Sequence, residues 1–141
     1  MPILNPKNNI DGVISIVENA QQFVVIVSPY SDLTGWDKLK EAINGASTRG
    51  VNVFYYVRKG EGSNGIEELN VKIYEVDMLH AKMFFNENEA IIASFHLMNN
   101  EDINWAILLN NQQEYKGLID FFDRFIKPSA ILHKNNRLFT L

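Results

Sequence analysis

Two short apolar runs separated by a helical pattern constrain the fold of this chain more than any other feature of its sequence. The run FVVIVSPY, at residues 23–30, is rich in β-branched side chains, which is typical of a strand buried on both faces. The run VNVFYYV, at residues 51–57, has the same character. Between them, apolar residues recur at helical spacing from Trp36 to Ala46. Strand, helix and strand in this order predict a crossover between parallel strands.

Two more helices are predicted, one on either side of this crossover. Apolar residues at helical spacing follow Asn8 and Asn9, so a first helix is expected over about residues 10–21. A last helix is expected after Asn111 and before Pro128, because proline cannot continue a helix. Two pairs have the spacing of a capping box, namely Thr34 with Asp37 before the middle helix and Asn111 with Glu114 before the last one.

The second half of the chain adds shorter strands. A helical turn is expected over residues 66–69, before a strand over residues 71–76. The run KMFFNENEAIIAS, at residues 82–94, predicts an antiparallel hairpin with a four-residue loop. A further strand is expected over residues 104–109. The predicted fold class is therefore α/β, with a mixed β-sheet flanked by helices in a single domain.

The composition limits both the architecture and the chemistry. The chain has 141 residues, of which 46% are apolar, so it can form one compact domain with its own core. It contains no cysteine, which excludes disulfides, thiolate zinc ligands and cysteine nucleophiles. The sequence shows no secretion signal and no apolar run long enough to cross a bilayer, so a cytoplasmic location is expected. The net charge of -4 argues against a surface covered with basic groups for polyanions.

The predicted hairpin carries a concentration of reactive side chains. His80 and Lys82 are two residues apart in an extended segment, so their side chains should point to the same side. If the two strands pair, Ser94 and His96 return beside them. An imidazole can act as a nucleophile or an acid near neutral pH, while a lysine and a hydroxyl can bind phosphoryl oxygens. This pattern favours a phosphate site that needs no metal.

The same residues also fit structural roles. His80 fits a histidine that hydrogen-bonds a carbonyl at a strand end, Lys82 an exposed lysine at a sheet edge, and Ser94 a turn residue. A metal site would have to use His80, His96 and Asp102, although their spacing matches no familiar ligand set. The residues alone leave these alternatives open.

The segment around the hairpin resembles a known family. The sequence HAKMFFNENEAIIASFHLMNN, followed by NWAILLN, resembles the signature region of the phospholipase D superfamily. The motif of that family is H-x-K, then an aspartate, then G-S-x-N, then an acidic residue on the next strand. Upstream, VSPY and VNVFYYVR are similar to the first half of single-motif members such as small bacterial nucleases. The resemblance covers about residues 10–126 and implies a phospholipase D-like α/β/α sandwich, with residues 127–141 as a C-terminal tail.

The resemblance implies a role for each matching residue. His80 would be the nucleophile that forms a phosphohistidine, or the acid that protonates the leaving oxygen. Lys82 would bind phosphate, and Ser94 would be the motif serine. The sequence departs from the motif where Glu87 replaces the aspartate, Ala93 the glycine, His96 the asparagine and Asn104 the following acid, unless Glu101 or Asp102 serves instead. Losing that acid matters most, because a carboxylate fixes the tautomer of a catalytic imidazole.

These features predict a metal-independent phosphodiesterase that acts on DNA or RNA and needs no cofactor. A chain with one motif needs a second copy of it, so the resemblance implies a homodimer with a shared active site. His96 and Asn104 are expected to bind substrate. Tyr30 and Arg58 are expected to do so too, because they follow strand ends, where open α/β sheets usually bind ligands.

A second class of function is also consistent with the sequence. The chain would then be a catalytically impaired phospholipase D-like module that binds phosphate or nucleic acid and dimerises within a larger DNA- or RNA-processing system. The acidic balance and Asn104 favour this alternative. Phospholipid processing is disfavoured, because the sequence shows neither a membrane-binding amphipathic surface nor a second motif.

Overall fold

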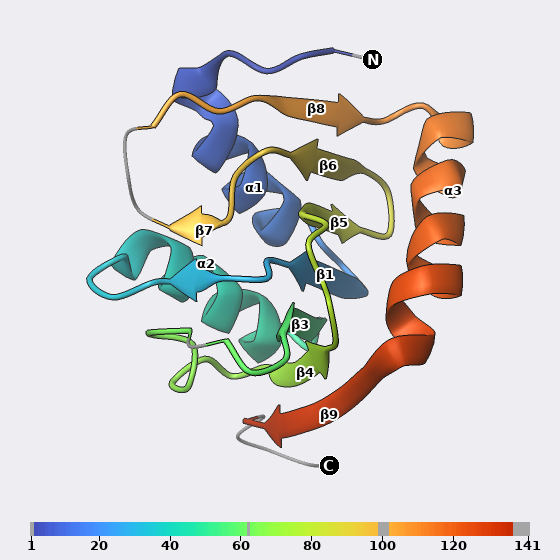
Figure 1. Ribbon diagram of the computed structural model, residues 1–141. Coiled ribbons are helices and arrows are strands. Elements are labelled where there is room, and N and C mark those ends of the chain that lie inside the picture. The colour runs from blue at the N-terminus through green and yellow to red at the C-terminus, as the bar shows by residue number, and fades with distance from the viewer. Residues whose placement is uncertain (1, 62, 99–101, 137–141) are drawn as a thin grey trace.

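The structure, a computed structural model, describes residues 2–61, 63–98 and 102–136 of the chain. Its centre is a seven-stranded sheet with strand order β8-β6-β5-β1-β3-β4-β9 (Figure 1). A second, two-stranded sheet pairs β2 with β7. The strands are β1 (Phe23–Val27), β2 (Ser31–Asp32), β3 (Asn52–Arg58), β4 (Lys72–Val76), β5 (Met83–Asn86), β6 (Ala90–Ala93), β7 (Leu97–Met98), β8 (Ala106–Leu109) and β9 (Ala130–Asn135).

The main sheet is mixed, as the sequence predicts. β1, β3 and β4 pair in parallel, so the strand–helix–strand segment is the predicted crossover. β5 pairs antiparallel with both β1 and β6, and β6 pairs antiparallel with β8. Because β5 runs opposite to β1, the start of β5 lies beside the carboxyl end of β1, with Met83 opposite Val27.

Helices cover both faces of this sheet and give the predicted α/β/α layers. α1 (Asn9–Glu18) and α2 (Asp37–Thr48) pack on one face, and α3 (Gln112–Phe121) packs on the other (Figure 1). Along β1, Val24 and Ile26 belong to the core under α1 and α2, whereas Val25 and Val27 belong to the core under α3. β1 is therefore buried on both faces, as its continuous apolar run predicts.

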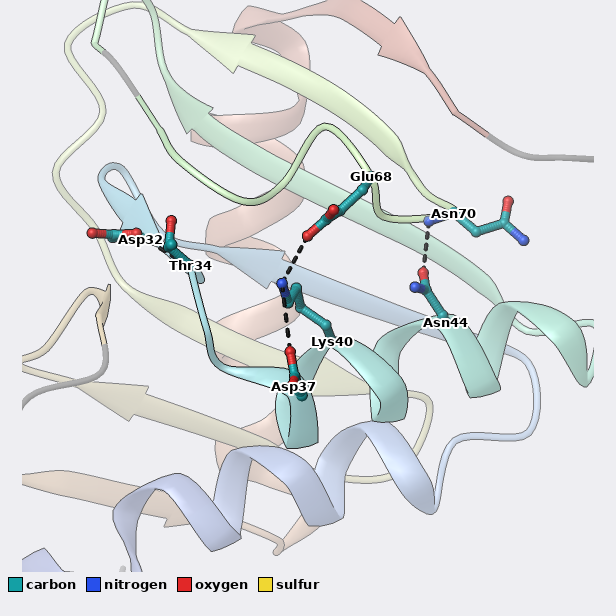
Figure 2. Close-up of polar contacts among 7 residues, drawn as sticks. All are labelled: Asp32, Thr34, Asp37, Lys40, Asn44, Glu68 and Asn70. Atoms are coloured by element: carbon teal, nitrogen blue, oxygen red, sulfur yellow. Dashed lines mark hydrogen bonds and ion pairs between the residues drawn. The ribbon is translucent and has the colours of Figure 1, made fainter.

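The amino-terminal end of α2 differs from the prediction. The residue that precedes it, Trp36, makes no side-chain capping hydrogen bond, so the predicted capping box of Thr34 and Asp37 is wrong. Instead, the Thr34 N–H donates to Asp32 Oδ1 at 3.1 Å (Figure 2). The Asp32 side chain thus stabilises a local turn after β2, and the Thr34 N–H is the donor in that turn.

Polar side chains tie α2 to the loop before β4 (Figure 2). The Lys40 ammonium lies 2.7 Å from a Glu68 carboxylate oxygen and 3.8 Å from an Asp37 carboxylate oxygen. The Asn70 N–H donates to Asn44 Oδ1 at 2.7 Å. Residues 66–69 form a single turn, in which the Leu69 N–H donates to Ile66 O at 3.1 Å, where the sequence predicts a short helical turn. These contacts hold the crossover helix against the chain that enters the next parallel strand.

The carboxyl-terminal part of the chain combines one confirmed prediction with three further elements. Asn111 Oδ1 accepts from the Glu114 N–H at 2.9 Å, and Asn111 Nδ2 donates to Glu114 Oε1 at 2.8 Å, which confirms a reciprocal cap on α3. The helix then continues as a π-helical segment, Phe122–Ile126, and a 3₁₀ turn, Lys127–Ser129. β9 follows and pairs antiparallel with β4 at the edge of the sheet.

Other element boundaries shift by a few residues. α1 ends at Glu18 rather than near residue 21, and β1 ends at Val27 rather than at residue 30. β8 begins at Ala106 rather than at residue 104. Within the described residues, none of the helices combines the length and the apolar character that crossing a membrane requires.

Candidate active site

The His80–Lys82 pair lies in the extended segment that leads into β5. Lys82 Nζ is 3.4 Å from His80 Nε2, so the two side chains point to the same side, as their spacing predicts. An ammonium group can only donate, so Nε2 accepts this contact and Nδ1 carries the ring proton while the lysine is charged. His80 is exposed and Lys82 is half-buried, which leaves both groups accessible to a ligand.

The β5–β6 hairpin brings its second strand back to this pair. Met83 pairs with Ile92, and the ladder continues to Ala93, whose N–H donates to Lys82 O at 3.3 Å. Residues 94–96 therefore follow directly after the point where the chain meets Lys82. The hairpin loop is one residue shorter than predicted, because β5 extends to Asn86, whose N–H donates to Glu89 O at 3.1 Å, and three residues separate it from β6.

His96 joins the pair, and we refer to His80, Lys82 and His96 as the histidine–lysine cluster. The ring centroid of His96 lies 6.1 Å from that of His80 and 4.8 Å from that of Tyr30, both in edge-to-face geometry. The Tyr30 N–H donates to His96 Nδ1 at 3.4 Å. Because Nδ1 accepts, Nε2 carries the proton of the neutral ring and is available as a donor.

The small second sheet holds His96 in place. Leu97 follows His96 in β7, and its N–H donates to the buried Ser28 Oγ at 2.8 Å. The Ser28 hydroxyl donates in turn to Tyr30 O at 2.7 Å. Ser28 therefore fixes the segments on both sides of the His96 ring. Nothing near Ser28 in the sequence signals this role, because its partner Leu97 lies on a distant strand.

The environment lowers the pKa of His96 from 6.5 to about 4. Burial is the largest cause, followed by the positive charges of Lys82 and His80, because each disfavours a protonated ring. A lowered pKa means that the ring takes up its second proton only at a lower pH than a free imidazole does. At neutral pH, His96 is therefore an uncharged hydrogen-bond donor beside a charged lysine.

We predict that an NMR titration will show the His96 imidazole protonating with a midpoint near pH 4. A Lys82→Met variant should raise this midpoint, because it removes one of the positive charges that disfavour protonation. A His133→Gln variant serves as the control, since His133 lies on β9 and contacts Glu75. A His96 midpoint close to 6.5 in the unmodified protein would contradict the half-buried, positively charged environment.

Ser94 and Asn104 form a separate pair beside the cluster. The Ser94 hydroxyl donates to Asn104 Oδ1 at 3.1 Å and accepts from the Trp105 N–H at 2.9 Å. The Asn104 carbonyl accepts from Asn9 Nδ2 at 3.0 Å, which anchors this segment to α1. In the described part of the chain, neither Ser94 nor Asn104 hydrogen-bonds to the histidine–lysine cluster. The hydroxyl of Ser94 thus connects the end of β6 to the segment before β8.

Arg58 lies at the end of β3 and contacts the loop that leads to His80. Its Nη2 is 4.0 Å from Met78 Sδ. Met78 is 75% exposed and has a φ of 59°, a left-handed conformation that is uncommon for a residue with a side chain. Arg58 therefore lies beside the loop that precedes His80 of the cluster.

Glu87 is at the sequence position of the motif aspartate, and its carboxylate stabilises a turn of the backbone. Glu87 lies just beyond β5, at the opposite end of the strand from His80. Its carboxylate accepts hydrogen bonds from the N–H groups of Gln21, Gln22 and Phe23 at 2.9, 3.0 and 3.2 Å. Burial by itself would raise the pKa of Glu87, but these bonds outweigh it and hold the pKa below its usual 4.5. Glu87 therefore secures the turn between α1 and β1.

Two of the alternatives raised by the sequence do not match the geometry. Within the described residues, no group of three or more His, Asp or Glu side chains is placed to hold a metal ion, so the site built from His80, His96 and Asp102 is wrong. In the same residues, the His80 side chain contacts Lys82 and His96 and is not hydrogen-bonded to a backbone carbonyl. The ring therefore does not have the structural role of a satisfied strand-end histidine.

Comparisons with known proteins give a clear answer for the fold. No protein-family model and no curated protein sequence matches the chain. Among solved structures, Nuc from Salmonella typhimurium, a phospholipase D family member, matches with a TM-score of 0.72 and 14% identity, over 94% of this chain and 98% of that chain. The chain has the phospholipase D superfamily fold. In this fold, the predicted H-x-K pair lies immediately before β5.

Two further structures share the phospholipase D fold of this chain. NucT from Helicobacter pylori matches with a TM-score of 0.71 and 10% identity, over 94% of this chain and 98% of that chain. TrmBL2, an archaeal chromatin protein described as showing a novel mode of DNA binding, matches with a TM-score of 0.66 and 15% identity. That match covers 94% of this chain and 52% of TrmBL2. Identities this low establish the phospholipase D fold, and the activity has to be argued from the site itself.

Proposed function

We propose that the chain is a metal-independent phosphodiesterase that acts on nucleic acid through a phosphohistidine intermediate at His80. The observation that carries this proposal is the 3.4 Å contact between Lys82 Nζ and His80 Nε2. A phosphoryl oxygen that binds the Lys82 ammonium would release the Nε2 lone pair next to the phosphorus atom. His96, as a neutral donor, would bind a second phosphoryl oxygen.

The first chemical step is a displacement at phosphorus. His80 Nε2 forms a bond to phosphorus while the bond from phosphorus to the leaving oxygen breaks, and the leaving oxygen takes a proton from an acid. In the second step a water oxygen attacks phosphorus and the P–N bond breaks. The proton of that water passes to the group that acted as the acid, which regenerates the free enzyme.

We infer that the acid is His80 of the partner subunit in a homodimer. A twofold axis beside the cluster would bring the two imidazoles to opposite sides of one phosphate. Exposed apolar side chains flank the cluster in sequence and favour burial against a second copy. They are Met78, Met98, Ile103 and Trp105, with exposed fractions from 41% to 90%.

The remaining candidate residues have supporting roles in this proposal. Tyr30 orients His96, and Ser94 with Asn104 shapes the edge of the phosphate site. Arg58, on the approach to the cluster, would contact the backbone of a DNA or RNA strand. The DNA binding described for TrmBL2, which has the same fold, supports nucleic acid as the substrate class. The proposed setting for this reaction is the cytoplasm.

A cleavage assay in EDTA tests the proposed activity. Labelled single- and double-stranded DNA and RNA are incubated with the full chain at about pH 5 to 8. Cleavage that EDTA does not inhibit is the expected result, because the proposed nucleophile and phosphate ligands are protein side chains. The absence of cleavage of all four substrates would contradict the proposal.

Light scattering after gel filtration tests the shared site. The expected mass at micromolar concentration is twice that of the 16.2 kDa chain. A Trp105→Glu substitution should shift the protein towards the monomer and lower cleavage in parallel, since the exposed Trp105 is proposed to be buried between subunits. A monomer that cleaves at full rate would remove the basis of the shared-site mechanism.

A second candidate function is a noncatalytic module that binds phosphate or nucleic acid and dimerises within a larger system. The specific observation that favours it is the position of Asn104, whose side chain is paired with Ser94. In the described residues, no carboxylate forms a hydrogen bond or ion pair with His80. Salt-dependent binding of labelled DNA or RNA without cleavage would support this module.

A further inference from the structure

A groove on the face of the sheet that α3 covers lies away from the histidine–lysine cluster. It has a volume of about 700 Å³ and is partly open, which falls in the range of sites for small molecules. Phe23 and Phe54 line it near the starts of β1 and β3, whereas the cluster lies beyond the carboxyl ends of these strands. The groove is therefore a separate site from the one described above.

Aromatic rings form the walls of this groove. Tyr56 and Tyr74 are stacked with centroids 5.0 Å apart and planes 14° apart. The Phe122 ring packs edge-on against Tyr56 at 5.2 Å. Phe23, Phe54 and Tyr74 remain only half-buried, although a closed core would bury them fully. The exposed parts of these rings give a planar ligand a surface on which to stack.

Polar groups reach the same groove. Asp123 and Lys127 line it from successive turns of the helical segment, and within the described residues neither forms an ion pair. In the same residues, the hydroxyls of Tyr56 and Tyr74 have no hydrogen-bond partner. The pKa of Tyr56 is raised to about 12 by burial first, then by Tyr74 and by Asp123. The Asp123 carboxylate therefore lies near the Tyr56 hydroxyl, and both can bond a ligand.

The helix changes its geometry where it lines the groove. The segment Phe122–Ile126 is π-helical, a rare arrangement that often occurs at functional sites. It contains two groove residues, the ring of Phe122 and the carboxylate of Asp123. The irregular turn is a further observation, independent of the aromatic walls, that distinguishes this surface from ordinary helix–sheet packing.

From these features we infer that the groove binds a small, uncharged, planar heteroaromatic molecule of the purine nucleoside class. The stacked and half-buried rings match a flat π-system, and the tyrosine hydroxyls, the Asp123 carboxylate and the Lys127 ammonium match its donors and acceptors. One acidic and one basic side chain line the groove, which favours a ligand without net charge. A saturated apolar ligand would leave these polar groups without partners.

Adenosine is the probe that tests this inference. Titration into the isotope-labelled full chain, followed by NMR, should give saturable shifts at Phe54, Tyr56 and Tyr74. Tyr74→Ala should weaken the affinity at least about tenfold. Ala130→Leu should also weaken it, because Ala130 lines the groove and a longer side chain would fill it without removing a core residue. Phe125→Ala is the matched control and should leave the affinity unchanged, because Phe125 is 61% exposed outside the groove.

Two further probes make the test specific for the ligand class. Adenosine 5′-monophosphate should bind more weakly than adenosine, because the Asp123 carboxylate offsets the Lys127 ammonium and leaves the cost of desolvating the charged phosphate uncompensated. Cyclohexanol should bind more weakly because it cannot stack. Either probe binding as tightly as adenosine would overturn the inference. So would shifts confined to the histidine–lysine cluster, affinity unaffected by both groove substitutions, or no saturable binding up to about 5 mM adenosine.

Discussion

Replacing His80 with alanine is expected to lower the rate of EDTA-resistant cleavage at least about a thousandfold. The substitution removes the nitrogen that is proposed to attack phosphorus and, in a homodimer, also the nitrogen that is proposed to protonate the leaving group. His80 is exposed and lies outside the regular strands, so the fold should be retained. The measurement is the single-turnover rate of strand cleavage, with circular dichroism to confirm folding.

The control for this substitution is His133→Ala. His133 is an exposed histidine on β9 that contacts Glu75, and β9 lies at the edge of the sheet next to β4. Its loss should leave cleavage within about twofold of the unmodified rate, because the side chain takes no part in the proposed reaction. Equal cleavage by the His80→Ala and unmodified proteins would show that another group carries the reaction or that the cleavage comes from a contaminant.

The sequence predicts the parts of this molecule that depend on short-range patterns. Continuous apolar runs predict buried strands, and β1 is buried on both faces. The period of two in a strand predicts that His80 and Lys82 share a side, and their side chains are in contact. The reciprocal cap at Asn111 is also local, because its partner is three residues away.

Other features depend on partners that only the folded chain brings together. The contact of Tyr30 with His96 requires β7 to pair with β2. Both strands are only two residues long, so neither shows a periodic pattern from which the pairing could be predicted. The Ser94 hydroxyl could equally have faced the cluster, but the pairing of β6 with β8 places it beside Asn104. The Thr34 capping box failed for the same reason, since a competing partner, Asp32, occupies its N–H.

We predict that Asn86→Ala will lower the free energy of unfolding by about 3 kcal/mol. The sequence alone does not indicate this structural role of Asn86. The side chain is 1% exposed and donates from Nδ2 to the Ile16 carbonyl at 2.8 Å. Its Oδ1 accepts from the N–H groups of Asn88 and Glu89 at 2.8 and 3.0 Å. Alanine would leave the buried carbonyl and both donors without this partner. Urea unfolding with an unchanged slope measures the loss.

Asn88→Ala is the matched control, because Asn88 is an exposed asparagine in the same hairpin loop. Among the residues that the structure describes, its side chain hydrogen-bonds only to the neighbouring Glu87, at 3.4 Å, so its removal should cost no more than about 0.5 kcal/mol. Equal unfolding midpoints for the two variants would contradict the role given to Asn86. Because Asn86 lies at the opposite end of β5 from His80, the folded fraction of Asn86→Ala should still cleave nucleic acid at the unmodified rate. We therefore expect Asn86→Ala to be destabilised but active, and His80→Ala to be stable but inactive. This contrast would show that Asn86 stabilises the hairpin and that His80 carries out the reaction.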